Sequence, residues 1–403
     1  PYTVRITGEG GFRLIESDAK GDSNTPRDQG QLLIRGNRIS NSLEFGIVVD
    51  AGARDGSGNA PHQGPVRVTR KLNPSRLVPG VVLQNNLINR SGTGGIRMSG
   101  DPSASGQQAA AVPFGRVVNN TIVGGTVGIQ VDENASPTIL NNIFSRVDTG
   151  IQVDPTAAET VLGGNLFQRT ITPASGIALS NTAIILSDTD PLFVNAGTGN
   201  YYLAAGSRAI DSSIDSLEDR PALVEVKSPM GIAPSPIEAP AQDLLGQLRV
   251  DDPTVSTPPG QGEVVFKDRG AIDRADFNGP IAVLVDPRDN DALGQDRDPR
   301  NTYVELTNQV LSHFSIQLFD GAEPNDPREG SGADDNTVRG NRVSVFRDGE
   351  PLLQGIDYEF HYDATNNIIR LTPLAGIWEI DHVYDIQLSN GQGLLLSAPP
   401  GNV

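Results

Sequence analysis

A chain of 403 residues with 45 glycines and 29 prolines is long and rich in turn residues, so we expect two domains or a repeat protein with a cap. The formal net charge of -18 argues against nucleic acid and an anionic membrane surface, and no run of 18 apolar residues predicts membrane insertion. The absence of cysteine excludes disulfides and Cys-ligated zinc.

Between residues 30 and 180 one pattern recurs five times. An apolar pair is followed by an Asn near a turn, an apolar residue and, about nine residues later, Gly-Ile; the copies are 33–50, 82–98, 117–132, 139–154 and 161–179. Asn120, Asn142 and Asn165 are 22 and 23 positions apart, which suits one unit of a solenoid. Such short strands bury a face only when coils stack, so the pattern predicts a right-handed parallel β-helix.

The repeated Asn and Gly residues are interpreted as scaffold. Asn tolerates a left-handed bend, and its amide can donate to and accept from the equivalent Asn of the next coil. The Gly before each Ile would supply a second tight corner. A leucine-rich repeat is the competing solenoid, but its leucine spacing is missing, and the residues between Asn142 and Gly150 leave no room for a helix.

Two coils are lengthened after their Gly-Ile strand, by residues 51–79 and 101–113. Both insertions should emerge along one edge of the solenoid, where binding loops tend to lie. The first has a local charge of +4, because Asp55 alone opposes its basic residues. The candidate glycan- or partner-binding residues are Arg54, His62, Arg67, Arg70, Lys71 and Arg76. They could bind a carboxylated or sulfated glycan or an acidic protein face, or they could form a solvated loop.

The end of the repeat region carries a recognisable set of motifs. The sequence reads DPLFVN at 190–195, GNYYL at 199–203, GSRAID at 206–211 and DRGAID at 268–273. It resembles bacterial surface proteins with right-handed β-helix repeats, which often end the solenoid in this way and close it with a "DxGA" strand. The resemblance implies a β-helix over 1–275 and an extracellular or cell-surface location, but no particular activity. Residues 212–262 are expected to wrap the solenoid as irregular chain.

From residue 276 the pattern changes to alternating strands separated by turn residues. They fall at 281–285, 314–318, 343–346, 358–362, 368–371 and 383–388, which suits a β-sandwich. The run 355–390 resembles bacterial immunoglobulin-like (Ig-like) modules found in tandem on surface proteins. The resemblance implies an Ig-like β-sandwich over 276–403. Trp378, the only tryptophan, is expected against its core.

The region from 279 to 403 has 20 acidic and 8 basic residues, a net charge of -12. Two acidic stretches could supply the oxygen ligands that calcium prefers. The candidate metal ligands are Asp286, Asp289, Asp291, Asp296, Asp298, Asp320, Asp334 and Asp335. Neither stretch has the spacing of an EF-hand, so bound calcium and solvated acidic loops both remain open.

Catalysis is the weaker alternative. The predicted fold resembles that of pectate-lyase-like enzymes, which implies an Arg or Lys base and calcium-bound acidic residues on a strand face. The residues in comparable places are Asp50, Asp132 and Asp154, which would form a vertical acidic column, with Arg97, Gln130 and Gln152 beside it. The column could act as paired carboxylates, or it could be a turn-forming Asp repeated with its turn. No catalytic residue is assigned.

These features favour a non-catalytic structural or adhesive segment of an extracellular or cell-surface bacterial protein. Because the chain begins at Pro1 and reads at once as strand, it is expected to be a piece of something longer. Its expected partners are itself or other surface proteins: the basic insertion of one copy could meet the acidic sandwich of another and so build filaments or arrays. The alternative is a polysaccharide lyase or glycan-binding module acting on acidic polysaccharide along the inserted edge. Calcium is the only cofactor considered, and neither nucleic acid nor membrane insertion is expected.

Overall fold

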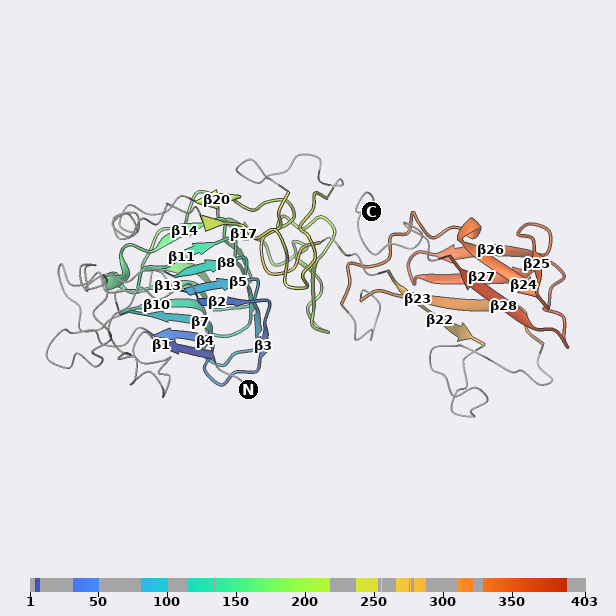
Figure 1. Ribbon diagram of the computed structural model, residues 1–403, viewed down its shortest axis with the longest axis horizontal. Helices are drawn as coiled ribbons and strands as arrows, with labels where there is room; N and C mark the ends of the chain where they lie inside the picture. Colours follow the sequence, from blue (N-terminus) through green and yellow to red (C-terminus); the bar gives the residue numbers. More distant parts are fainter. Residues whose placement is uncertain are drawn as a thin grey trace, which may run out of the picture. The chain divides into compact units, whose positions relative to one another are not determined.

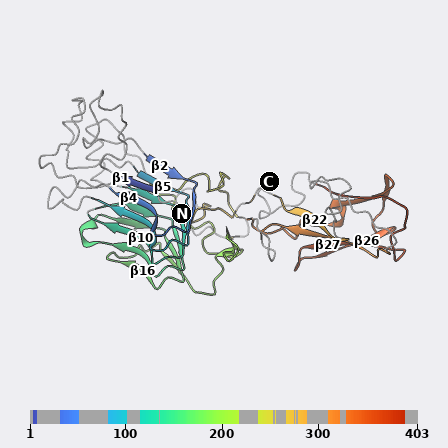
Figure 2. The same cartoon turned by 90° about the horizontal axis from the view of Figure 1, so that it is seen from below.

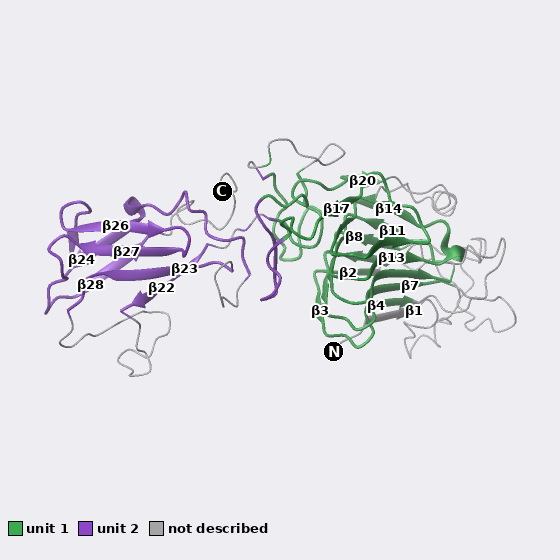
Figure 3. Ribbon diagram, turned by 180° about the vertical axis from the view of Figure 1, so that it is seen from behind, with its two compact units in different colours: residues 1–192, 206–251, 255–273 green, residues 193–205, 252–254, 274–403 purple. Residues whose placement is uncertain are grey.

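The computed structural model describes residues 4–7, 32–50, 81–100, 115–133, 135–217, 237–252, 255, 266–274, 276, 279–287, 310–321 and 329–389. The chain divides into two compact units (Figure 3). Unit 1 comprises residues 1–192, 206–251 and 255–273, and unit 2 comprises 193–205, 252–254 and 274–403. Within the described ranges, no helix is long and apolar enough to cross a membrane.

Three parallel sheets stack along unit 1 (Figures 1 and 2). Sheet A has the order β1 (Val4–Thr7), β4 (Phe45–Asp50), β7 (Gly94–Ser99), β10 (Val127–Asp132), β13 (Thr149–Val153) and β16 (Thr172–Ser175). Sheet B has the order β14 (Val161–Gly163), β11 (Thr138–Leu140), β8 (Arg116–Val118), β5 (Val81–Gln84) and β2 (Leu32–Arg35). Sheet C has the order β17 (Ile184–Leu186), β15 (Leu166–Gln168), β12 (Ile143–Ser145), β9 (Thr121–Val123), β6 (Leu87–Asn89) and β3 (Arg38–Ser40). Each coil thus adds one strand to each sheet, as a parallel β-helix requires.

The core of the coil stack is built from equivalent residues of successive coils. Ile96, Ile129 and Ile151 pair in register in sheet A, and all three are fully buried. The apolar pair of each repeat points two ways: Val117 belongs to this core, whereas Val118 packs outside sheet B against a later segment of the chain. A sequence period therefore becomes a vertical column of like side chains.

The glycine before each isoleucine was expected at a tight corner, and that prediction is wrong for the second, third and fourth copies. Gly95, Gly128 and Gly150 lie inside or at the start of the strands of sheet A. A Cβ on Gly128 would lie 2.4 Å from the Gly150 carbonyl oxygen and 2.4 Å from Phe144 Cδ1. Glycine is required there because the next coil and an aromatic ring pack directly against the backbone, not because the chain turns.

The predicted asparagine ladder is present and links five coils. We name its members the inner asparagine column: Asn37, Asn86, Asn120, Asn142 and Asn165. The Nδ2 of Asn120 donates to Asn142 Oδ1 at 3.0 Å, and Asn142 repeats this toward Asn165 at 3.0 Å. The left-handed bend, however, belongs to the preceding residue, as at Asn119 (φ 51). Two adjacent residues divide the roles that were expected of one.

The Gly-Ile strand expected in the fifth copy is replaced by a strand that lies three residues earlier in register. Residues 176–179 were predicted to continue sheet A, but β16 ends at Ser175 and aligns Ala174 with Ile151. Gly176 instead turns with φ +78, where a Cβ would lie 1.9 Å from the Val153 carbonyl oxygen. Ile177 and Leu179 then pack against the core, so this segment covers the core and ends the repeat in sheet A.

Unit 1 closes with irregular chain that lies on the coil stack, as expected for part of 212–262. We call the described segments of this chain, 206–217, 237–251 and 266–273, the strap. It contains the short antiparallel pair β20 (Ser216–Leu217) and β21 (Ile237–Glu238). The predicted closing strand at 268–273 is wrong, because these residues form bends with no strand pairing. Their backbone groups bond to side chains and turns of the coils instead.

Unit 2 contains two small antiparallel sheets and a hairpin. The hairpin pairs β18 (Phe193–Asn195) with β19 (Asn200–Leu203). One sheet has the order β22 (Ile281–Asp286), β23 (Phe314–Phe319), β27 (Ile368–Pro373) and β26 (Tyr358–Asp363), and the other has β25 (Glu350–Leu352), β24 (Val343–Arg347) and β28 (Tyr384–Leu388). Both sheets contribute to one core cluster. Trp378 lies in this cluster, 4% exposed, with its ring 4.8 Å from Phe314 and 5.0 Å from Tyr384 between centroids, which confirms its predicted place.

Candidate functional site

The outward face of sheet A carries a polar cluster built from two adjacent coils. Alternation along β7 buries Ile96 and Met98 and leaves the Arg97 side chain 37% exposed. Arg97 Nε lies 2.8 Å from Asp132 Oδ2 on the next coil. Gln130 Nε2 donates to the same carboxylate, at 3.0 Å and 2.8 Å to its two oxygens. This is the one place on the described part of sheet A where an Arg and an Asp pair.

The acidic column expected beside this cluster is interrupted. Asp50 aligns with Ser99, and Ser99 aligns with Asp132, so Asp50 and Asp132 are two strands apart, about 10 Å by the usual spacing. Asp154 follows the end of β13, and its Oδ1 accepts hydrogen bonds from Thr156 Oγ1 (2.6 Å) and Thr156 N (2.9 Å). These bonds lower the pKa of Asp154 below its ordinary value. The predicted column of Asp50, Asp132 and Asp154 is therefore interrupted by Ser99 between Asp50 and Asp132.

The chemistry available to the cluster follows from how its members are used. Both oxygens of Asp132, whose side chain is 17% exposed, accept hydrogen bonds from Gln130, and one also accepts from Arg97. Ser99 Oγ donates to Glu133 beside them. A general base must present a free lone pair to its substrate, and here three hydrogen bonds from neighbouring side chains already occupy most of the acceptor positions of Asp132. The arrangement is that of a structural ion pair with one partly exposed guanidinium.

The predicted basic patch cannot be placed on this face. Arg54, His62, Arg67, Arg70, Lys71 and Arg76 all lie outside the described residues, as does the second insertion through residue 113. The strands that precede the two insertions, β4 and β7, are neighbours in sheet A and are paired in parallel. The prediction that both insertions leave from one edge of the solenoid is consistent with this pairing.

Four of the predicted calcium ligands also lie outside the described residues: Asp289, Asp291, Asp296 and Asp298. The others engage neighbouring groups of unit 2. Asp286 Oδ2 lies 3.0 Å from His313 Nε2, and Asp335 Oδ1 accepts from the Tyr362 hydroxyl at 2.7 Å. Asp320 is buried, and Asp334 Oδ1 accepts from the backbone N of Asn336. In the ranges that the structure describes, no three His, Asp or Glu side chains gather as a metal site would require. Calcium binding stays a prediction.

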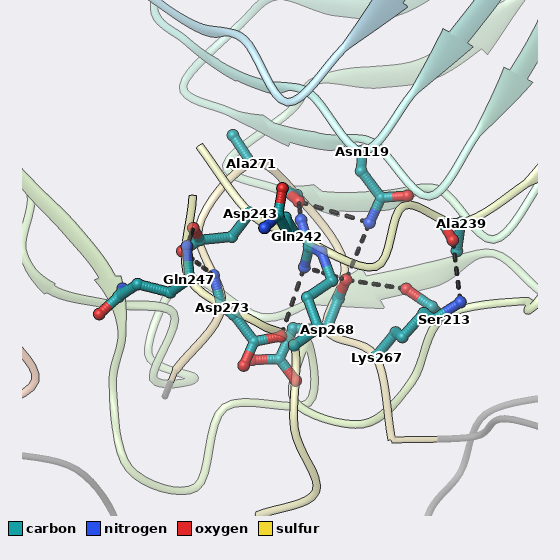
Figure 4. Close-up of polar contacts among 12 residues, drawn as sticks. Asn119, Ser213, Ala239, Gln242, Asp243, Gln247, Lys267, Asp268, Ala271 and Asp273 are labelled. Carbon is teal, nitrogen blue, oxygen red and sulfur yellow. Dashed lines mark hydrogen bonds and ion pairs between the residues drawn. The ribbon is translucent and has the colours of Figure 1, made fainter. Parts of the chain in front are cut away.

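The densest polar network of unit 1 lies where the strap meets the coils. Three asparagines in the left-handed conformation each directly precede a member of the inner column. They are Asn85, Asn119 and Asn141, and we call them the outer asparagine column. Their Nδ2 groups donate to backbone oxygens of the strap: Asn85 to Gln242 at 2.5 Å, Asn119 to Asp268 at 2.9 Å and Asn141 to Ile214 at 2.7 Å. Figure 4 shows the contact of Asn119 with Asp268. These residues were missed from the sequence, although the Asn-Asn pair of three successive copies was their signal.

Arg249 joins the outer column to the strap from within. Its side chain is 0% exposed, and its Nη2 donates to Asn85 Oδ1 (3.0 Å) and the Gly270 carbonyl (2.8 Å). Its Nη1 donates to the Asp268 carbonyl at 3.0 Å and lies 3.5 Å from Asp273 Oδ2. A buried guanidinium is tolerable only with this many acceptors, because its desolvation cost is large.

The structure explains why the first three residues of DRGAID are Asp, Arg and Gly. Arg269 donates to the carbonyls of Ser212, Asn165 and Thr182, and its burial, with Arg208 nearby, lowers its pKa to about 9. A Cβ on Gly270 (φ +86) would lie 2.6 Å from Ile143 Cδ1. Asp268 Oδ1 accepts from the backbone N of Asp211, which ends the GSRAID segment. Two of the four motifs that carried the family resemblance, GSRAID and DRGAID, therefore lie side by side, and Arg269 and Gly270 hold the strap against the coils.

Comparison with known proteins agrees with this architecture. Residues 27–213 match the family described as right handed beta helix region, a span that covers the five coils and ends in the first part of the strap. Together with the three parallel sheets, the match supports a right-handed β-helix repeat protein. No curated protein and no solved structure matches the chain.

Proposed function

We propose that this chain is a non-catalytic structural or adhesive segment of an extracellular or cell-surface bacterial protein. The observation that carries the proposal is the use of its buried polar groups. Both asparagine columns, Arg249 and Arg269 bind groups of the chain itself. A β-helix held in this way is a rigid stalk whose side chains serve its own continuity.

The organisation of unit 2 supports the second part of the proposal, an Ig-like module after the stalk. Its two antiparallel sheets surround one core with a central tryptophan, an arrangement that suits a β-sandwich. The resemblance of residues 355–390 to modules found in tandem on bacterial surfaces points to the same architecture.

A second candidate function, acting on or binding acidic polysaccharide, has one observation in its favour. Arg97 is partly exposed on the outward face of sheet A, on β7, the strand that precedes the second insertion. A guanidinium can bind the carboxylate of a uronic acid. Against catalysis stands the engagement of Asp132 and Asp154 with neighbouring hydrogen-bond donors.

Incubation of the chain with uronic-acid polymers, with and without calcium, tests the choice. We expect no unsaturated product above that of an Arg97→Ala variant, measured by the ultraviolet absorbance of the cleaved sugar. Sustained product that requires Arg97 would contradict the structural proposal and support a lyase. Retention of the chain on immobilised acidic polysaccharide without product would support the adhesive form of the proposal.

A further inference from the structure

Two connections of unit 2 present aliphatic side chains to solvent. They join β25 to β26 and β27 to β28, in the part drawn in orange and red in Figure 1. Six large aliphatic residues of these connections are exposed, and we call them the aliphatic end: Leu353, Ile356, Leu374, Ile377, Ile380 and Val383. Their exposed fractions lie between 46% and 69%. A cluster of large apolar side chains on a soluble surface marks a site of interaction.

Hydrogen bonds hold the two connections together. The backbone N of Leu374 donates to the Asp357 carbonyl at 2.9 Å, and the backbone N of Asp357 donates to the Leu353 carbonyl at 2.8 Å. Asp357 Oδ2 in turn accepts from the backbone N of Leu353 at 2.7 Å. At the far end of the second connection, Asp348 and Val383 exchange two hydrogen bonds. The aliphatic end is thus a defined surface.

The core of unit 2 does not account for these residues. Trp378 is 4% exposed and packs with Phe314 and Tyr384, whereas Ile377, immediately before it, and Ile380, two residues later, point outward. The connection therefore supplies one side chain to the core and keeps its isoleucines outside. Because these side chains lie outside the core cluster, another molecule is the expected contact.

The rim of the aliphatic end is acidic. Asp348, Asp357, Glu379 and Asp381 lie on or beside the two connections. The basic groups there are engaged: Arg347 Nη1 lies 2.6 Å from Glu379 Oε2, and His382 Nδ1 lies 2.5 Å from Asp348 Oδ2. An aliphatic surface with a net negative rim fits a partner segment that combines aliphatic and basic side chains.

The chain itself contains such a segment. Residues 64–79, in the first insertion and outside the described ranges, read GPVRVTRKLNPSRLVP, with five aliphatic and four basic residues and no acidic one. We propose that the aliphatic end of one copy binds residues 64–79 of a second copy. The proposal rests on the structural function proposed above and names its partner. Because the two surfaces differ, the contact is heterologous and extends from copy to copy.

Sedimentation equilibrium of the full chain over a range of concentrations tests the contact. The wild type should associate reversibly, and the double variant Ile356→Ser, Ile380→Ser should lose association by about tenfold or more. A triple variant Arg67→Glu, Arg70→Glu, Lys71→Glu should lose it to a similar degree, since it reverses the charge offered to the acidic rim. The matched control is Ile171→Ser, which removes a side chain 82% exposed in unit 1 and should leave association unchanged.

A synthetic peptide of residues 64–79 supplies an independent readout. The peptide should bind the wild type and compete with its association. The fluorescence of Trp378 shows whether the double variant is still folded, so that a loss of association can be separated from a loss of fold. A wild type that stays monomeric at every concentration overturns the proposal, and so does association that survives the isoleucine changes. Binding of the peptide to a chain that never associates would assign the surface to the copy's own insertion and also overturn it. None of these results bears on the lyase assay, so the proposed function and this contact can fail separately.

Discussion

The coil stack and the strap satisfy their buried polar groups in different ways. In the stack, each amide of the inner asparagine column bonds to its own copy in the next coil, from Asn86 through Asn165. In the strap, the buried groups bond to partners of other kinds, as when Arg249 bonds to Asn85, Asp273 and two carbonyls. Loss of one asparagine at the end of the column leaves the other Asn–Asn bonds in place. Loss of a strap contact such as that of Arg249 leaves no equivalent contact elsewhere. The following variants separate the two cases.

The largest effect is expected for Arg249→Ala in the strap. The variant leaves Asp273 and Asn85 buried without their guanidinium, which should lower the free energy of unfolding of unit 1 by about 3–5 kcal/mol. Circular dichroism during denaturation with guanidinium chloride follows the sheets. Because Trp378 is the only tryptophan and lies in unit 2, its fluorescence serves as an internal reference. The matched control Arg208→Ala, an exposed arginine of the same strap, should change little; equal losses in both variants would argue against the buried pair.

A smaller effect is expected in the stack. Asn142→Ala removes the acceptor of Asn120 Nδ2 and Asn120 N, and the unsatisfied amide should cost about 1–3 kcal/mol. Asn37→Ala changes an exposed residue at the end of the same column and should cost clearly less. The midpoint of denaturation, followed by circular dichroism, compares the two. Similar midpoints would show that position along the column does not matter, against the comparison drawn above.

The smallest effect concerns Asp154, which belongs to neither column. Its bonds with Thr156 lower its pKa in the folded state, so the unfolded chain takes up the proton first. The stability that this carboxylate contributes is full above its ordinary pKa and is lost as the pH falls through the lower folded value. We expect the difference in denaturation midpoint between wild type and Asp154→Asn to shrink as the pH is lowered into that window. A difference independent of pH would contradict this account of the carboxylate.

Repetition explains what could be predicted from the sequence. The inner asparagine column was predictable because each member has a neighbour of the same type at the spacing of one coil. The pairing of Arg97 with Asp132 followed from the same register, but the carboxylate column failed because the coil of β7 has Ser99 where its neighbours have aspartate. The role of Gly128 also escaped prediction, since a close approach between coils and a turn both favour glycine.

The strap contacts could not be predicted because the residues that form them do not recur at a regular spacing in the sequence. Arg249 and Asn85 are 164 positions apart, and nothing in either local sequence names the other. The fifth copy misled for a related reason: Gly176-Ile177 repeats the pattern, yet Ile177 packs against the core in a segment that is no longer strand. Pattern alone does not show where a solenoid stops, because the last coil needs a cover and the covering residues are also apolar.

The inner asparagine column has a consequence for how such a chain can change its length. Within the column, each amide from Asn37 to Asn142 donates to the next member, so the column has a direction. A duplicated coil of the same design could enter the column without leaving a donor or acceptor unmatched. The outer column removes that freedom, because Asn85, Asn119 and Asn141 each hold a different point of one strap. An additional coil between these asparagines would move them apart, and the strap could no longer accept all three of their hydrogen bonds. The strap thereby fixes the number of coils between Asn85 and Asn141.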